Sequence, residues 1–188
     1  MVRAWYLESD AGGVKVLSQE DGRMELLGVD ELTEKTGLLF WTASRYNRLF
    51  SSYCCRTRHE IDVDNIKNIK ENETLKKIKQ ERGYTWEDDI EISKRTLPDF
   101  EEKTKAFATE HMHPDEEVRL VLDGTGFFDV RDREDRWIRL QFQKGDMIAL
   151  PPGMYHRFNL GSDEGYLKLH RIFSTVPQWT AHNRIADD

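Results

Sequence analysis

The second half of the chain is a succession of short apolar or alternating runs, and this pattern constrains the fold more than any other feature. From residue 117 onward the runs are EVRLVL, FFDVRD, WIRLQF, MIALP, MYHRFNL and YLKLHRIF. They are separated by the turn-forming strings D-G-T-G, R-E-D-R, K-G-D, P-P-G and G-S-D-E-G. Strands at this spacing predict a sandwich or barrel. A small double-sheet jelly roll is the natural construction.

The first half carries helical signals after an opening strand, AWYL. We expect helices over residues 28–37, 71–82, 85–97 and 99–107. Gly37, Gly83 and Pro98 stand at or just beyond the ends of three of these segments, as is typical of helix ends. Thr85 is the expected N-cap of the third. The predicted fold class is therefore mainly β with peripheral helices, an α+β arrangement.

Composition excludes several classes of protein. The 188 residues include 35 acidic and 28 basic side chains, a net charge of −7, which argues against general nucleic-acid binding. No apolar run is long enough to span a bilayer, and the start, MVRAWYLESD, lacks a secretion signal. The two cysteines, Cys54 and Cys55, are adjacent and poorly placed to bridge each other. A reducing compartment follows, so we expect a cytoplasmic protein, with the nucleus left open.

Four metal-ligating side chains have compatible spacing. His111, His113 and Glu117 form the string H-x-H-x-x-x-E, and His156 follows in P-P-G-x-Y-H. The two nearby histidines face the same way on an extended strand. A straight strand would carry Glu117 roughly 20 Å from His111, so the chain must fold back, and the Pro-Asp pair after His113 is the predicted turn. Three imidazoles and one carboxylate can hold a divalent transition metal and leave two octahedral positions open.

Strand parity adds two arginines to this cavity. Glu117 and Arg119 share one face of their strand, so a metal-facing Glu117 directs Arg119 into the same cavity. There Arg119 could stabilise developing negative charge, which makes it the candidate catalytic residue. In YLKLHRIF, Arg171 shares the apolar face, and we expect it to face the pocket and contact substrate. His170 falls on the opposite face and is not expected to be a ligand.

The remaining polar candidates have weaker signals. Tyr155 and Arg157 point away from the metal by parity. Glu110 is either a partner of a ligand histidine or a solvent-exposed residue, and both interpretations stay open. His59 and His182 have no partner pattern and are interpreted as structural or exposed.

The expected organisation is one domain over residues 1–188. Residues 1–106 would form the N-terminal strand and helical region, and residues 107–176 the metal-binding β-barrel core. The stretch 43–61 contains arginines and no acid before Glu60. It is interpreted as an inserted surface loop, with a basic contact or targeting patch as the alternative.

The strings EHMHPDEEVRLVLDGTGFFDVRD and KGDMIALPPGMYHRF closely resemble acireductone dioxygenase, the cupin of methionine salvage. The resemblance extends over nearly the whole chain, through AWYL, ERGYTWED and W-T-A-H-N-R-I-A-D. It implies a cupin double-sheet jelly-roll barrel. The arginine-rich stretch departs from the family, whose members generally join the flanking segments with few residues. The chain also ends soon after Asn183-Arg184, where many members carry a further short tail.

The resemblance also implies an activity and a set of site residues. The family cleaves 1,2-dihydroxy-3-keto-5-methylthiopentene with O2. Iron gives formate and 4-methylthio-2-oxobutanoate, whereas nickel gives formate, CO and 3-methylthiopropanoate. The family's ligands correspond to the four residues named above, and its pocket arginine corresponds to Arg119. Its substrate-contacting phenylalanines correspond to Phe107 and Phe158.

The expected cofactor is one Fe(II) or Ni(II) per chain, because imidazole and carboxylate suit both ions. The expected partners are the acireductone substrate and O2, and the protein is expected to be a monomer, with a protein partner left open. Two alternatives remain at this stage. One is a different enediol dioxygenase or isomerase, and the other is a regulatory cupin that binds a partner through the arginine-rich stretch.

Overall fold

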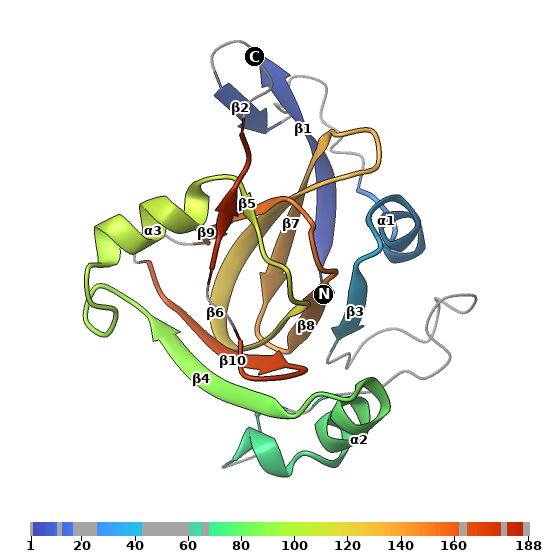
Figure 1. Cartoon of the computed structure of the whole chain (residues 1–188), viewed down its shortest axis with the longest axis vertical. Coiled ribbons are helices and arrows are strands. Elements are labelled where there is room, and N and C mark those ends of the chain that lie inside the picture. The colour runs from blue at the N-terminus through green and yellow to red at the C-terminus, as the bar shows by residue number, and fades with distance from the viewer. Residues whose placement is uncertain are drawn as a thin grey trace.

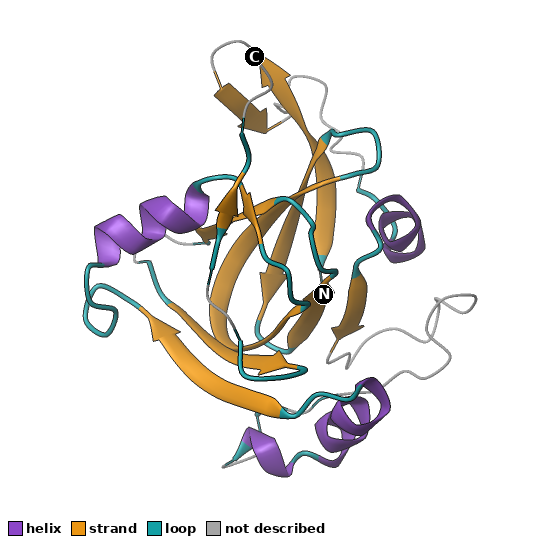
Figure 2. Ribbon diagram, viewed as in Figure 1, coloured by secondary structure: helices purple, strands orange, loops and turns teal. Residues whose placement is uncertain are grey.

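Two antiparallel sheets that share one long strand form the body of the protein (Figure 1; Figure 2). The computed structural model describes residues 2–10, 13–16, 26–42, 61, 63–64, 68–161, 165–177 and 180–185. The shared strand is β6 (Glu117–Arg131). Its first half pairs with β8 and β10, and its second half pairs with β7 and β9. The two sheets therefore meet along β6 and enclose the space between them.

The first sheet has the order β11-β5-β9-β6-β7-β1-β2. The bounds of its other strands are His182–Asn183 (β11), His111–Met112 (β5), His156–Leu160 (β9), Trp137–Gln143 (β7), Arg3–Asp10 (β1) and Gly13–Val16 (β2). In the second sheet, β6 lies between β10 (Leu167–Phe173) and β8 (Asp146–Leu150). Beyond these lie β4 (Trp86–Ile92), which pairs with β10, and β3 (Leu39–Thr42), which pairs with β8.

The string D-G-T-G does not separate two strands, and that prediction was wrong. β6 runs through it, with a register shift opposite Lys168 and Leu169 where the strand passes from one sheet to the other. Gly124 has φ +84°, a conformation that disfavours side chains, and a Cβ there would lie 2.7 Å from the Tyr166 carbonyl oxygen. A bulge with a glycine bends a strand without ending it. The glycine in D-G-T-G therefore indicates the bend at which β6 passes from one sheet to the other, and not the end of a strand.

The second sheet is buried on both faces. Along β8, Ile148 and Leu150 face the apolar interior between the sheets, whereas Met147 and Ala149 face a second apolar cluster. This second cluster is completed by α2 (Glu73–Arg82), the short 3-10 helix η2 (Ile69–Glu71) and Ile61. A strand covered on both faces reads as a continuous apolar run, which explains the sequence MIALP.

Three predicted helices are confirmed. They are α1 (Val29–Thr36), α2 and α3 (Phe100–Ala108). Gly37 and Gly83 end the first two in the left-handed conformation, with φ of 77° and 71°. The Asn72 side chain accepts a hydrogen bond of 2.9 Å from the Leu75 amide and so caps α2. Figure 2 shows the helices at the periphery of the sheets. The fold class, mainly β with peripheral helices, is confirmed.

The helix predicted over residues 85–97 is wrong, because residues 86–92 form β4. β4 pairs along its whole length with β10, from Trp86 opposite Phe173 to Ile92 opposite Leu167. These pairing partners lie far away in the sequence, and tertiary pairing overrides a local helical preference. A period-two pattern was present, since Ile90 and Ile92 alternate with acidic residues.

The barrel draws on both halves of the chain. β1, β3 and β4, all before residue 107, extend sheets that the later strands build. The arginine-rich stretch predicted as a surface loop lies outside the described residues, except for Ile61, which is fully buried. Within the described part of the chain, no helix is long and apolar enough to cross a membrane.

Candidate metal centre

Neighbouring strands of the first sheet bring the predicted ligands together. His111 on β5 lies directly opposite His156 on β9, and β9 also pairs with β6, the strand that begins at Glu117. The chain bends at the Pro-Asp pair after His113, so the predicted fold-back is confirmed. Residues that are distant on a straight strand thus converge on one point.

The three imidazoles form a compact group. One ring nitrogen from each of His111, His113 and His156 lies within 4.8 Å of the others. The Glu117 carboxylate belongs to the same group, because its Oε2 lies 3.5 Å from Nε2 of both His113 and His156. His111, His156 and Glu117 are buried, with 6%, 3% and 7% of their surface exposed. Imidazoles and a carboxylate at this separation match the donor set of a divalent transition metal.

Main-chain carbonyls orient all three rings. The Nδ1 of His111, His113 and His156 lies 2.7, 3.1 and 2.9 Å from a carbonyl oxygen, and donates to it. The three acceptors belong to Thr109, Thr180 and Met154, in that order. A proton on Nδ1 leaves the Nε2 lone pair free to face the centre, which is the usual arrangement of metal-binding histidines.

The protonation states suit metal binding. Burial, reinforced by the neighbouring His156, lowers the pKa of His111, so its neutral ring is favoured. Burial alone would raise the pKa of Glu117, but the Arg119 guanidinium and His156 outweigh it and hold that pKa well below the usual range. The site therefore favours a neutral His111 ring and an ionised Glu117 carboxylate, the forms in which these groups bind metals.

Arg119 lies beside Glu117. Its Nη2 lies 3.1 Å from Glu117 Oε1, and its Nη1 donates to the Val118 carbonyl oxygen at 3.0 Å. The guanidinium also lies 5.1 Å from the ring centroid of Phe173. Only 8% of Arg119 is exposed. A buried, aligned guanidinium next to a candidate metal site is well placed to meet an anionic substrate.

Arg171 lies directly opposite Arg119, on the same face of the second sheet. Its position therefore agrees with the pocket-facing orientation that parity predicted. However, its guanidinium binds Asp88 of β4 through two hydrogen bonds, one of them 2.7 Å from Nε to Oδ1. This carboxylate partner offsets the repulsion between two facing arginines. Whether Arg171 contacts substrate stays a prediction.

Phe107 and Phe158 meet beside the metal centre. Phe158 lies two residues after His156 and contacts Phe107 of α3, with ring centroids 6.1 Å apart. Both line a cavity of about 220 Å³. The buried ring of Phe128 lies between Phe158 and the histidines, with its centroid 5.9 Å from that of His156 and 5.4 Å from that of Phe158. Lys94, Thr104 and Asn159 line this cavity together with apolar side chains, and none of the four candidate ligands does.

Comparison with known proteins assigns the family. The ARD/ARD' family pattern matches residues 49–181. This chain belongs to that family. A human protein named acireductone dioxygenase is 42% identical over 188 residues, which cover 100% of this chain and 91% of the relative. A Drosophila pseudoobscura protein of the same name is 39% identical, with 100% and 89% covered.

A solved structure shares the fold. Acireductone dioxygenase from Bacillus anthracis, described with a cadmium ion in its active centre, aligns with a TM-score of 0.63 at 20% identity. The alignment covers 96% of this chain and 97% of that one. At this identity the likeness supports the fold, and it agrees with the predicted cupin barrel.

The other polar residues of the family motif have structural contacts. The Glu110 carboxylate accepts hydrogen bonds of 3.0 and 3.1 Å from Arg131 and one of 3.1 Å from Arg184. Arg157 binds Asp129 at 2.8 Å. His170 is fully buried on the far side of β10, with its ring nitrogens 2.6 Å from Asp89 and 3.0 Å from Glu87. Both of its ring nitrogens are therefore within hydrogen-bonding distance of carboxylates on β4.

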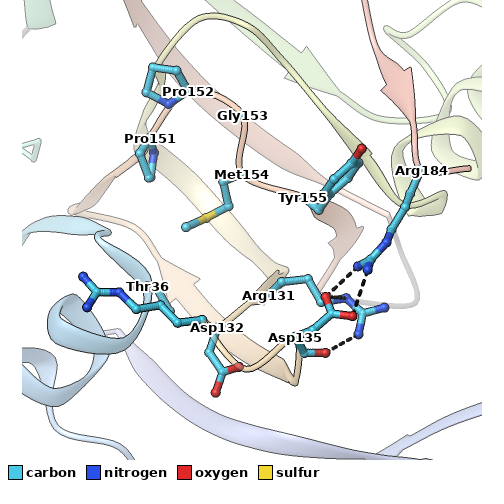
Figure 3. A pocket seen from close by; sticks show the side chains of 11 residues that line it. Thr36, Arg131, Asp132, Asp135, Pro151, Pro152, Gly153, Met154, Tyr155 and Arg184 are labelled. Carbon is cyan, nitrogen blue, oxygen red and sulfur yellow. Dashed lines mark hydrogen bonds and ion pairs between the residues drawn. The ribbon is translucent and has the colours of Figure 1, made fainter. Parts of the chain in front are cut away.

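A larger depression of about 550 Å³ contains none of the predicted ligands. Figure 3 shows Arg131 and Arg184 reaching Asp135 at one side of it, near Tyr155. The Arg184 guanidinium binds the Asp135 carboxylate through contacts of 2.6 and 2.8 Å. Its charged groups therefore largely satisfy one another, and the depression adds no donor to the metal centre.

Sequence reasoning missed the groups that hold the site in place. The carbonyl of Thr180 and the carboxylate of Asp88 act on residues 67 and 83 positions away. A main-chain carbonyl leaves no signature in a sequence. Asp88 does belong to an acidic run in the sequence, Glu87-Asp88-Asp89. In the fold, Asp88 and Asp89 pair directly with Arg171 and His170 on the neighbouring strand β10.

Proposed function

We propose that the protein is an acireductone dioxygenase that cleaves 1,2-dihydroxy-3-keto-5-methylthiopentene with O2, as in methionine salvage. The observation that carries the proposal is the convergence of His111, His113, His156 and Glu117, with all three Nδ1 atoms held by carbonyls. Family membership supplies the reaction. The geometry supplies a site able to perform it.

These four residues would hold one Fe(II) or Ni(II). Three nitrogens and one oxygen suit either ion, and nickel binds such sites more tightly than iron. When bound, such an ion would supply Lewis-acid chemistry that favours the deprotonated enediol. Charge balance and substrate positioning can be assigned to other side chains of this protein.

Arg119 would balance the negative charge of the bound enediolate. Its guanidinium is buried and is oriented by Glu117 and the Val118 carbonyl, so little reorganisation is needed when charge develops. Phe107 and Phe158 would contact the apolar arm of the substrate and exclude water from the reacting carbons. Arg171, held by Asp88, would add positive charge on the same face of the sheet.

The test is product analysis after controlled metal loading. Metal-free protein is loaded anaerobically with Fe(II) or Ni(II) and given the substrate with O2. We expect formate and 4-methylthio-2-oxobutanoate with iron, and formate, CO and 3-methylthiopropanoate with nickel. Metal-free protein should show only the background oxidation of the enediol. A rearranged product without O2 consumption would instead indicate an isomerase.

A further inference from the structure

His113 differs from the other two candidate histidine ligands in the origin of its carbonyl partner. His111 and His156 each donate to a carbonyl two residues earlier in the chain, at 2.7 and 2.9 Å. His113 donates at 3.1 Å to the carbonyl of Thr180, which lies 67 positions later. The His113 side chain is also more exposed than that of His156, at 21% against 3%. The orientation of His113 therefore depends on how firmly a distant segment is held.

That segment, residues 180–185, contributes no buried apolar side chain. Its strand β11 lies at the edge of the first sheet and pairs with the short strand β5. Every residue of the segment is exposed except Arg184. Because apolar burial is the main force that holds an element in place, the position of this segment rests on main-chain pairing and on the contacts of Arg184.

Arg184 joins β11 to two other parts of the molecule. Its main-chain N–H donates to the Glu110 carbonyl at 3.2 Å, and its guanidinium donates to the Glu110 carboxylate at 3.1 Å. Two further bonds, of 2.6 and 2.8 Å, reach both carboxylate oxygens of Asp135 in the turn between β6 and β7 (Figure 3). Arg131 also binds Glu110 and lies 3.6 Å from the Asp135 carboxylate. A bidentate pair inside such a network stabilises a structure more than an isolated surface pair does.

We propose that Arg184 is a positioning residue of the metal centre. By anchoring β11 it holds the Thr180 carbonyl against His113, and so keeps Nε2 of this ring directed at the metal. This inference rests on the metal centre of the proposed function. Loss of Arg184 should weaken metal binding through His113 alone, because the carbonyl partners of the other two histidines are local.

The first test measures Ni(II) affinity without substrate, by competition with a chelator of known affinity. Arg184→Gln removes the charge and the bidentate contact, and should weaken nickel binding by about 10-fold, the lower end of the range for loss of an outer partner of a ligand. Arg184→Lys keeps a charge but loses the planar fork, so it should restore part of the affinity. Asp135→Asn should also weaken binding, and asparagine tolerates the positive φ of 63° at this position.

Arg136→Gln is the matched control. Arg136 lies in the same turn and binds Asp132 and Glu134, and within the described part of the chain it has no contact with β11. Its nickel affinity should equal that of the unaltered protein. The double variant Arg184→Gln/Asp135→Asn should bind nickel about as weakly as Arg184→Gln, because both changes break the same contact. Equal nickel affinity in Arg184→Gln and the unaltered protein would overturn the proposal.

A second measurement shows whether the effect passes through His113. Protein with ¹⁵N-labelled histidine is loaded with Zn(II), and the exchange of the ligand Nδ1 protons with water is followed by NMR. In Arg184→Gln the His113 proton should exchange about 10-fold faster, because exchange requires the same local opening. The protons of His111 and His156 should exchange at unaltered rates. Equal acceleration of all these protons would indicate a general loosening of the fold and would overturn the proposal.

Neither measurement involves turnover, so the two proposals fail separately. A protein that binds nickel but leaves the enediol uncleaved would overturn the proposed function, and the affinity and exchange data would still decide the role of Arg184. Cleavage of the enediol with unaltered affinity and exchange in Arg184→Gln would overturn the role of Arg184 alone.

Discussion

Each imidazole of the candidate metal centre donates a hydrogen bond from Nδ1 to a main-chain carbonyl. The carbonyls of Thr109, Met154 and Thr180 accept the Nδ1 protons, and this leaves the Nε2 atoms to face one another. Strand parity was enough to predict from sequence that Glu117 and Arg119 point inward. The carbonyl partners were not predictable, because any residue can supply a carbonyl and only the folded chain decides which one does.

His156→Ala should abolish metal binding and turnover while the chain stays folded. The change removes one of four donors from a buried site, and no other described histidine lies within the group. Metal content by elemental analysis and folding by circular dichroism are the measurements. Full metal occupancy in this variant would refute the ligand assignment.

His170→Ala is the matched control, and it should give the opposite result. His170 is buried between Glu87 and Asp89. Its loss removes a contact from both carboxylates, although Glu87 keeps Lys79, and should lower the stability by about 1–3 kcal/mol. Metal content per folded chain should be unchanged. A large loss of metal in this variant would contradict the assignment of His170 to a position outside the metal site.

Arg119→Lys should retain the metal but reduce kcat/KM by roughly 10²-fold, similar to removing one stabilising donor from a transition state. Lysine keeps the charge next to Glu117 but loses the planar fork that reaches both Glu117 and the substrate position. Steady-state kinetics with measured metal content decide the matter. Unchanged kinetic constants would mean that Arg119 has only a structural role.

At the scale of elements, the sequence identified helices well and strands partly. Capping glycines marked the ends of α1 and α2, because the left-handed conformation requires them. Two errors concern strands. β4 was predicted as a helix, because its acidic run suits a helix start and its partner β10 lies far along the chain. β6 was predicted as two strands, because a Gly-rich string marks a turn and a bulge equally well.

Ile61→Ala tests how the second sheet is covered. Ile61 is fully buried with Leu75 and Ile78 of α2, so the substitution should cost about 2–5 kcal/mol. For a chain of this size, thermal denaturation should show a Tm lower by several degrees, with metal content per folded chain unchanged. Val63→Ala, at a half-buried position in the same cluster, should cost less. A stable Ile61→Ala protein would contradict this packing.

At the scale of the whole molecule, the barrel is completed by strands from both ends of the sequence. β1 extends one sheet beyond β7, and β11 pairs with β5 beside the candidate ligands. The sequence predicted the barrel and its family from the second half, where strands alternate with turns. The expectations of a monomer and of a cytoplasmic or nuclear location stay predictions.

Metal binding should stabilise the entire fold, because the four donors converge only when both sheets are formed. A metal present at about 100 times its Kd adds roughly 2.7 kcal/mol if it binds the native state alone. The Tm of metal-free protein should therefore rise by about 5–10 °C with Ni(II), and the Tm of His156→Ala should not. Equal shifts in both proteins would indicate binding elsewhere.

The most direct test of the central claim is a crystal structure of the nickel-loaded protein with anomalous diffraction at the nickel edge. We predict one strong peak per chain, bound by Nε2 of His111, His113 and His156 and by a carboxylate oxygen of Glu117, with two neighbouring positions free of protein ligands. A peak at another place, or a centre in which Glu117 stays with Arg119 and does not bind the ion, would contradict the account.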